Sequence, residues 1–148
     1  MAKMTLDETG RKYLMEIGLE PVGNRAILVE YAPNDNLGDK LANFFSLECY
    51  ILQMCKNELV LIPIHTRVVA GAVASCSLEN KVALQLSYSS IQSVKITEKG
   101  INYMVSITTD TETIRLLSPK KGVSTFMGAV GAWHMNNIDD TLQMLRSL

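Results

Sequence analysis

The sequence predicts a mainly β fold of the α+β class: a bent antiparallel sandwich or partial barrel of about seven strands, with a short N-terminal helix and a capping C-terminal helix. Three observations lead to this prediction. Between residues 47 and 117, apolar residues recur with the period of two that is typical of strands. Short turns separate most of these runs, which favours antiparallel neighbours. Both ends of the chain show helical spacing instead.

The composition indicates one globular domain with an ordinary surface. The 148 residues are 47% hydrophobic and 20% charged, with a net charge of −1, unlike disordered chains. The 14 basic and 15 acidic residues are interspersed, so we expect no nucleic-acid partner, because such binding needs clustered cations. Three cysteines and an N-terminus without a secretory pattern predict a cytoplasmic protein.

A helix is predicted over residues 6–17. Thr5 and Glu8 have the spacing of a capping box, in which each side chain accepts from a free backbone N–H of the other residue. Apolar residues then recur at helical intervals. Gly18 offers a left-handed stop, and Pro21 prevents continuation.

The run 25–31 predicts a buried or half-buried strand, and a short capped helix is expected over about 37–45. For the domain organisation we expect residues 1–35 to be an N-terminal helix and strand that extend the domain, and residues 36–148 to be the domain itself. Whether the first segment completes the sandwich or belongs to an interface stays open.

The middle of the chain predicts a series of antiparallel strands. Lys56-Asn57 suits a tight hairpin, because Asn tolerates positive φ. The strand before this turn has apolar side chains on both faces, so we expect it to be covered on both sides. Pro63 in the following strand favours a sheet edge or a bulge, and 68–77 is ambiguous between strand and loop. The remaining predicted strands are 82–88, 94–97, 101–109 and 113–117, expected to form a meander of neighbours.

The strand alternation is interrupted between residues 89 and 93. Tyr88 and Val94 have even numbers, whereas Ile91 between them is out of step. A continuous strand would expose Ile91 and bury serines, at a cost of roughly 2 kcal/mol or more. We therefore expect a corner or bulge in which Ile91 points inward and the serine hydroxyls bond to nearby backbone groups.

The end of the chain predicts a helix, because apolar residues recur with helical period from 138 to 148. Asn136 or Asn137 is expected as its N-cap. Glycines in the preceding segment favour a loop over 118–135, with Trp133 packed as its anchor.

These patterns carry a resemblance to a known family. The run "LQLSYSSIQSVKI", the strand pair "INYMVSITT" and "TIRLL", and the ending "WHMNNIDDTLQMLRSL" resemble bacterial pleckstrin-homology-like (PH-like) and GRAM-like domains. The resemblance covers about Leu47–Leu148. It implies a PH-like, strongly bent antiparallel sandwich plugged at one open end by the last helix. Family members that bind phosphoinositides carry several basic residues on the first hairpin loop, whereas the corresponding turn here contains Lys56 alone.

The candidate binding residues are therefore few. They are Lys56 in the hairpin turn and the adjacent pair Lys120 and Lys121. A peripheral membrane or phospholipid-binding domain is the alternative that these lysines leave open, with weak or no lipid binding expected.

Catalysis is not expected. The chain has two histidines and three cysteines, so a Cys–His nucleophile stays open as an alternative, a cysteine-dependent enzyme. It has no glycine-rich phosphate loop, G-x-S-x-G, H-E-x-x-H or C-x-x-C motif, and the spacing of the thiols and histidines differs from that of zinc modules. We expect no cofactor and no metal. The thiols and histidines weighed as nucleophiles or zinc ligands are Cys49, Cys55, Cys76, His65 and His134.

The leading interpretation is a non-catalytic, cytoplasmic, PH-like binding module for a protein, a peptide or its own copies. Pairing at a sheet edge uses main-chain hydrogen bonds, so it leaves no side-chain motif in the sequence. Homo-oligomerisation through such an edge belongs to the same interpretation.

Overall fold

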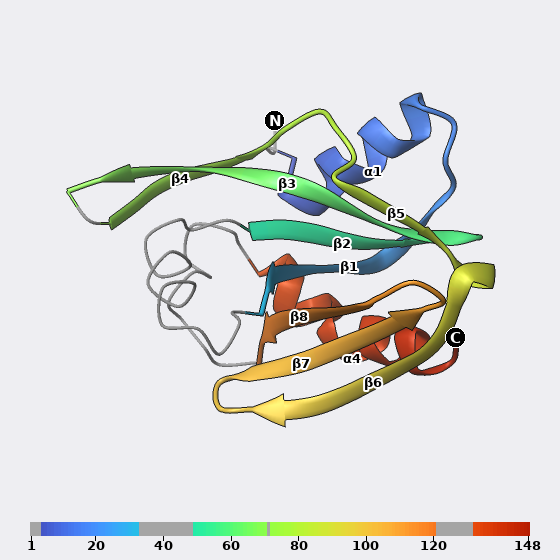
Figure 1. Cartoon of the computed structure of the whole chain (residues 1–148). Helices are drawn as coiled ribbons and strands as arrows, with labels where there is room; N and C mark the ends of the chain where they lie inside the picture. Colours follow the sequence, from blue (N-terminus) through green and yellow to red (C-terminus); the bar gives the residue numbers. More distant parts are fainter. Residues whose placement is uncertain (1–3, 33–48, 71, 121–131) are drawn as a thin grey trace.

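The computed structural model describes residues 4–32, 49–70, 72–120 and 132–148, and in them the fold is mostly β (Figure 1). Eight strands form an open antiparallel sheet in the order β4-β3-β2-β1-β8-β7-β6, and β5 also pairs with β3. The expected fold class, a mainly β sandwich or partial barrel with a C-terminal helix, is confirmed. The helix predicted over about 37–45 lies outside the described residues.

The first strand of the chain lies inside the sheet, between β2 and β8. The helices are α1 (Leu6–Glu16), the 3-10 turn η1 (Tyr88–Ser90) and α4 (Trp133–Arg146). The strands are β1 (Pro21–Tyr31), β2 (Cys49–Cys55), β3 (Glu58–Val69), β4 (Ala72–Leu78), β5 (Leu84–Ser87), β6 (Ile91–Lys99), β7 (Asn102–Thr109) and β8 (Thr113–Pro119).

Helix α1 forms as its local sequence predicts. The Thr5 hydroxyl accepts from the Glu8 N–H, and the Glu8 carboxylate accepts from the Thr5 N–H, each at 3.4 Å. Gly18 has a φ of 92° after the last turn, a conformation that glycine adopts without steric cost. Leu14 is fully buried against Val60 of β3 and its neighbours. The helix therefore covers one face of β2 and β3.

The β2–β3 hairpin turns at Lys56-Asn57 as expected, with Met54 opposite Leu59. The expected positive φ of Asn57 is wrong, because the non-glycine residues with positive φ in the described part of the chain are Asn24 and Ala70. The prediction that β2 is covered on both sides is confirmed. Every β2 side chain is buried except the partly buried Tyr50.

Pro63 lies where β3 changes its partner strand. The first part of β3, up to Leu61, pairs with β5, and the part from Ile64 onward pairs with β4. The Pro63 carbonyl accepts from the Glu79 N–H at 3.0 Å. Since the N–H and C=O of one residue in a strand point to the same side, the missing proline N–H also faces this break and removes no bond to β2. The local edge agrees with the position that the sequence predicts for Pro63.

The interrupted alternation is a corner, as predicted. The chain passes from β5 through η1 into β6, and the register of β6 on β7 shifts between Ile91 and Ser93. The Ser87 hydroxyl accepts from the Ser89 N–H at 3.2 Å, and the Ser90 hydroxyl donates to the Ser87 carbonyl at 2.7 Å. Ile91 packs against the central core. The prediction that the strands on either side of the corner are neighbours in the sheet is wrong, because β5 pairs with β3 and β6 with β7.

Helix α4 begins earlier than the sequence predicts. Its first residue is Trp133, and the residue before it, Ala132, makes no side-chain cap. Asn137, expected as a cap, is instead buried inside the helix and donates to the Ala26 carbonyl at 3.1 Å and to Asp7 Oδ2 at 3.4 Å. A tertiary contact with β1 and α1 thus takes the place of the local capping role.

His134, near the start of α4, bridges β1 and β8. The Leu28 N–H donates to His134 Nδ1 at 2.9 Å, so Nε2 carries the proton and donates to the Pro119 carbonyl at 2.8 Å. The Ser118 hydroxyl donates to the Leu28 carbonyl at 2.7 Å. The imidazole, which is fully buried, therefore replaces a direct bond of the β1–β8 ladder.

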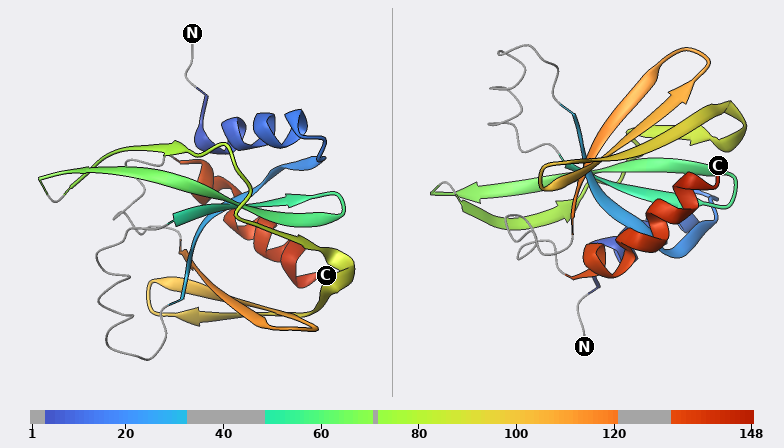
Figure 2. Two further views of the ribbon diagram at one scale, coloured as in Figure 1. Left: turned by 45° about the horizontal axis from the view of Figure 1, so that its top comes forward. Right: turned by 90° about the horizontal axis from the view of Figure 1, so that it is seen from below.

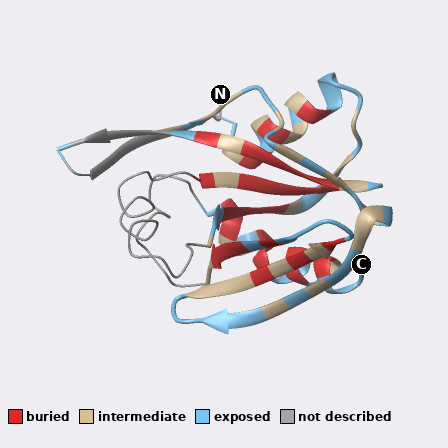
Figure 3. Cartoon of the chain, in the orientation of Figure 1, coloured by how far each residue is buried: buried red, intermediate tan, exposed pale blue. Residues whose placement is uncertain are grey.

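The two helices lie on opposite faces of the β1–β2–β3 part of the sheet (Figure 2). The main core lies on the α4 side, and burial is concentrated in the middle strands (Figure 3). Its buried residues are Ile27, Val29, Leu52, Met54, Leu59, Leu61, Val105, Ile107, Ile114, Leu116, Ile138, Leu142 and Leu145.

We expect His134→Phe to lower the free energy of unfolding by about 2–4 kcal/mol, because a ring of similar shape would leave the Leu28 N–H and Pro119 C=O buried without partners. Urea unfolding followed by circular dichroism measures the change. His65→Phe, at an exposed position, is the matched control and should change the value by less than about 0.5 kcal/mol. Equal stability of the two variants would contradict the bridging role.

The same histidine should make stability depend on pH. Burial lowers the pKa of His134, and its hydrogen bond to Pro119 opposes this effect. Because the unfolded chain binds the proton first, stability should fall as pH drops below about 6.5, by up to about 1.4 kcal/mol per pH unit, until the folded protein also binds it. Unfolding curves between pH 7.5 and 5 should show this slope in the wild type, whereas His134→Phe should lose it.

Candidate functional site

The lysines singled out in the sequence do not form one site. Lys56 lies in the β2–β3 turn and Lys120 next to the β6–β7 turn, and these turns are at opposite ends of the sheet (Figure 1). Lys56 Nζ is 3.7 Å from Glu20 Oε2. Lys120 Nζ is 3.2 Å from Glu98 Oε1 and 5.7 Å from the centre of the Tyr103 ring. Lys121 lies outside the described residues.

The thiols and histidines are also separate. Burial is the main factor that raises the pKa of the Cys49 and Cys55 thiols to about 12, so both are protonated at neutral pH. His65 is exposed, whereas His134 is occupied with backbone groups. In the described part of the chain, no group of three or more His, Cys, Asp or Glu side chains could hold a metal ion.

A cleft of about 480 Å³ lies at the break between β4 and β5. Its walls are Cys49-Tyr50 of β2, Pro63-Ile64 of β3, and residues 79 and 81–83 of the connecting segment. The charged groups of this segment, Glu79 and Lys81, form an ion pair of 3.4 Å. The two charged side chains of the lining thus neutralise each other.

Among the described strands, β6 forms one end of the open sheet and has a long edge without a paired strand. This strand spans nine residues and pairs with β7 on one side, so the backbone N–H and C=O groups on its other side are available to another strand. Figure 3 shows exposed and half-buried residues along it, in contrast to the buried middle strands. At the other end of the sheet β4 has seven residues and pairs with β3 on one side, and β5 has four residues.

The two faces of β6 differ in character. Ile91, Val94 and Ile96 point to the main core but are only partly buried. Ser93, Lys95, Thr97 and Lys99 point to the other face and are exposed. An extended segment that added to this edge would thus meet an apolar row on one face and a hydrophilic, basic row on the other. Sequence reasoning missed this surface, since an edge is a property of strand order.

Comparisons of the chain with protein-family models, with curated proteins and with solved structures gave no match. Among the described residues, no helix has the length and the apolar character needed to cross a bilayer.

The state of the buried thiols can be tested directly. At pH 8 we expect Cys49 and Cys55 to react with iodoacetamide at least about a hundredfold more slowly in the native protein than in urea, because a thiol with a pKa of about 12 is almost entirely protonated and is also shielded. Peptide mass spectrometry over time measures each site. Native labelling at the rate of the unfolded chain would instead favour the cysteine-dependent enzyme.

Proposed function

We propose that this protein is a non-catalytic PH-like binding module that takes up an extended segment of a protein or peptide along β6. The observation that supports this most strongly is the free edge of β6, which combines nine residues with an unpaired side and an incompletely buried apolar row. Strand addition uses such an edge: main-chain hydrogen bonds supply affinity, and alternate side chains supply specificity.

The chemistry of the described side chains supports a binding role more than a reaction. The protonated state of Cys49 and Cys55 removes the thiolate that a nucleophile needs, and the imidazole of His134 is held by Leu28 and Pro119. The free thiols are also in keeping with the reducing cytoplasm in which we place the protein.

The lysines that the sequence singles out give the lipid-binding alternative less support. Phosphate recognition needs several cations that surround one group. Lys56 and Lys120 each have an acidic neighbour and lie at different ends of the sheet, so they cannot act on one headgroup together.

The proposal predicts where a bound strand will be found. A random peptide library displayed on phage should yield binders to the full chain. Amide hydrogen exchange with a selected peptide should then show added protection at alternate β6 residues, because every second residue of an edge strand directs its N–H outward. Protection confined to β4, to β5 or to neither edge would contradict the assignment to β6, as would failure to select any binder.

A further inference from the structure

The outward face of the β6–β7–β8 half carries three cations in a regular arrangement. Direct pairing places Lys95 opposite Ser106, and Ser106 opposite Arg115. Two of the cations, Lys95 and Arg115, therefore lie in one row across the strands with Ser106 between them. Lys99 lies four residues further along β6, opposite Asn102. Lys95, Lys99 and Arg115 are all exposed.

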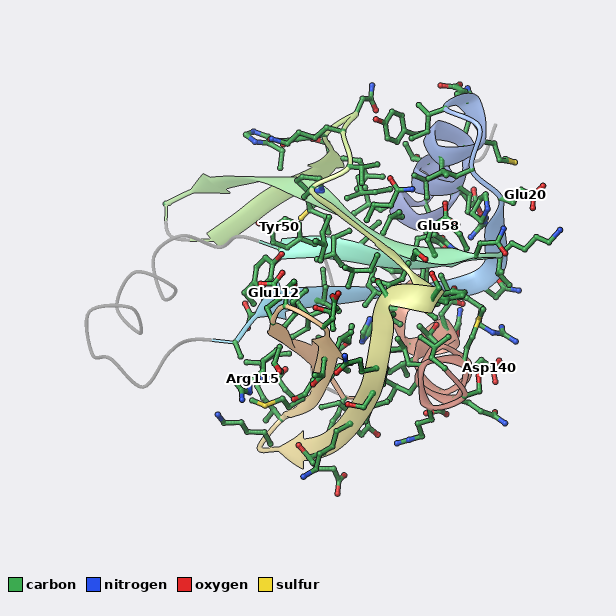
Figure 4. All side chains as sticks on the ribbon, turned by 45° about the vertical axis from the view of Figure 1, so that its right-hand side comes forward. Glu20, Tyr50, Glu58, Glu112, Arg115 and Asp140 are labelled. Atoms are coloured by element: carbon green, nitrogen blue, oxygen red, sulfur yellow. The ribbon has the colours of Figure 1, made fainter. Side chains whose placement is uncertain are left out.

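On β6, β7 and β8 this face carries no carboxylate, whereas on the adjoining strand β1 the exposed Glu30 lies opposite Leu117. The members of this face on β6, β7 and β8, by strand alternation, are Ser93, Lys95, Thr97, Lys99, Asn102, Met104, Ser106, Thr108, Thr113, Arg115, Leu117 and Pro119. None of the ion pairs found among the described residues involves Lys95, Lys99 or Arg115. Figure 4 shows Arg115 well separated from Glu20, Glu58 and Asp140, with Glu112 the labelled carboxylate nearest to it in this view.

A second copy is a poor occupant of this edge. In antiparallel pairing of two β6 strands around a twofold axis, a residue faces one of the same parity. A register centred on Lys95 puts the two lysines opposite each other, and one centred on Thr97 puts Lys95 opposite Lys99. A register centred on Ile96 leaves Lys95 of one copy diagonal to Lys95 and Lys99 of the other. Like charges in such positions are destabilising, so these three registers of β6 on its own copy are disfavoured.

On the basis of the proposed function, we propose that the occupant of the β6 edge is an acidic strand of another protein. Its outward face carries two carboxylates four residues apart, opposite Lys95 and Lys99, with a residue that suits Thr97 between them. Its inward face carries apolar side chains opposite Val94 and Ile96, where the core is only partly buried.

This register predicts a sequence pattern. Read from its N-terminus in antiparallel orientation, the partner strand passes residues 99 to 94 of β6 in turn. The pattern is acidic, polar, Thr or Ser, apolar, acidic, apolar. The polar second position faces Glu98, which is already paired with Lys120, and a threonine in the third position would make a Thr–Thr cross-strand pair with Thr97.

The test uses a matched pair of capped peptides, Glu-Ser-Thr-Val-Glu-Val and Gln-Ser-Thr-Val-Gln-Val, each flanked by glycines. Titration of the full chain at low ionic strength, followed by amide chemical shifts of β6, measures both dissociation constants. We expect the acidic peptide to bind about three to ten times more tightly, because two cross-strand ion pairs are gained. The difference should shrink in 0.5 M salt.

Variants of the protein provide the reciprocal test. In Lys95→Glu plus Lys99→Glu the preference should reverse in favour of the neutral peptide, while unfolding in urea should change little, since both positions are exposed. Lys12→Glu, an exposed lysine on α1, is the control of equal charge change per site and should keep the wild-type preference.

The outcomes separate the inference from the proposed function. Equal binding of the two peptides along β6 would overturn the acidic partner and leave strand addition intact. Library binders that map to β6 without the acidic pattern would do the same. If the test peptides and the library binders all leave β6 unperturbed, the proposed function fails together with the inference.

Discussion

The structure depends on one side chain in the middle of the sheet, because the imidazole of His134 takes the place of a backbone hydrogen bond between two strands. β1 and β8 pair directly at Glu30 and Tyr31. Two residues before Glu30 on β1, the ring of His134 lies between the Leu28 N–H and the Pro119 carbonyl. A buried backbone group without a partner is strongly disfavoured. The strands can therefore separate here only because the two nitrogens of one side chain satisfy both groups across a wider gap.

The separation gives α4 its place and thereby closes one side of the sandwich. Where β8 has ended, the helix continues along β1, with Asn137 on the Ala26 carbonyl and Asp140 Oδ2 3.8 Å from Arg25 Nη1. Its apolar residues complete the main core on the same side. On the opposite face α1 covers β2 and β3. The corner at η1 carries the chain from β5, paired with β3, to β6, paired with β7. The free edge of β6 follows from this topology.

The sequence predicts the features that depend on local physics. Strand alternation, the capping box of α1 and the corner around Ile91 each result from residues close together in the chain, and each is confirmed. The start of α4 was missed because Asn137 has two roles available to it, a cap and a buried donor, and the Ala26 carbonyl that decides between them lies 111 residues away. The prediction of a binding site at the candidate lysines has a related weakness, because adjacent charges form a patch only if the fold brings further charged residues to them. Lys95, Ser106 and Arg115, by contrast, are aligned by strand register, which the local sequence does not reveal.

An open edge exposes a protein to unwanted pairing, and the lysines of β6 bear on this problem as well as on partner choice. Exposed charged side chains on an edge strand oppose the addition of like-charged strands, and the most abundant competing strand in any solution of this protein is another copy of the same edge. On the proposal made above, repulsion between copies keeps the edge available without burying it. On the proposal of an acidic partner strand, the same two charges attract that strand, so one pair of side chains would both limit self-association and select a partner. Specificity of this kind needs no pocket and no catalytic motif, so the proposed binding surface is compatible with a chain that has no recognisable site residue.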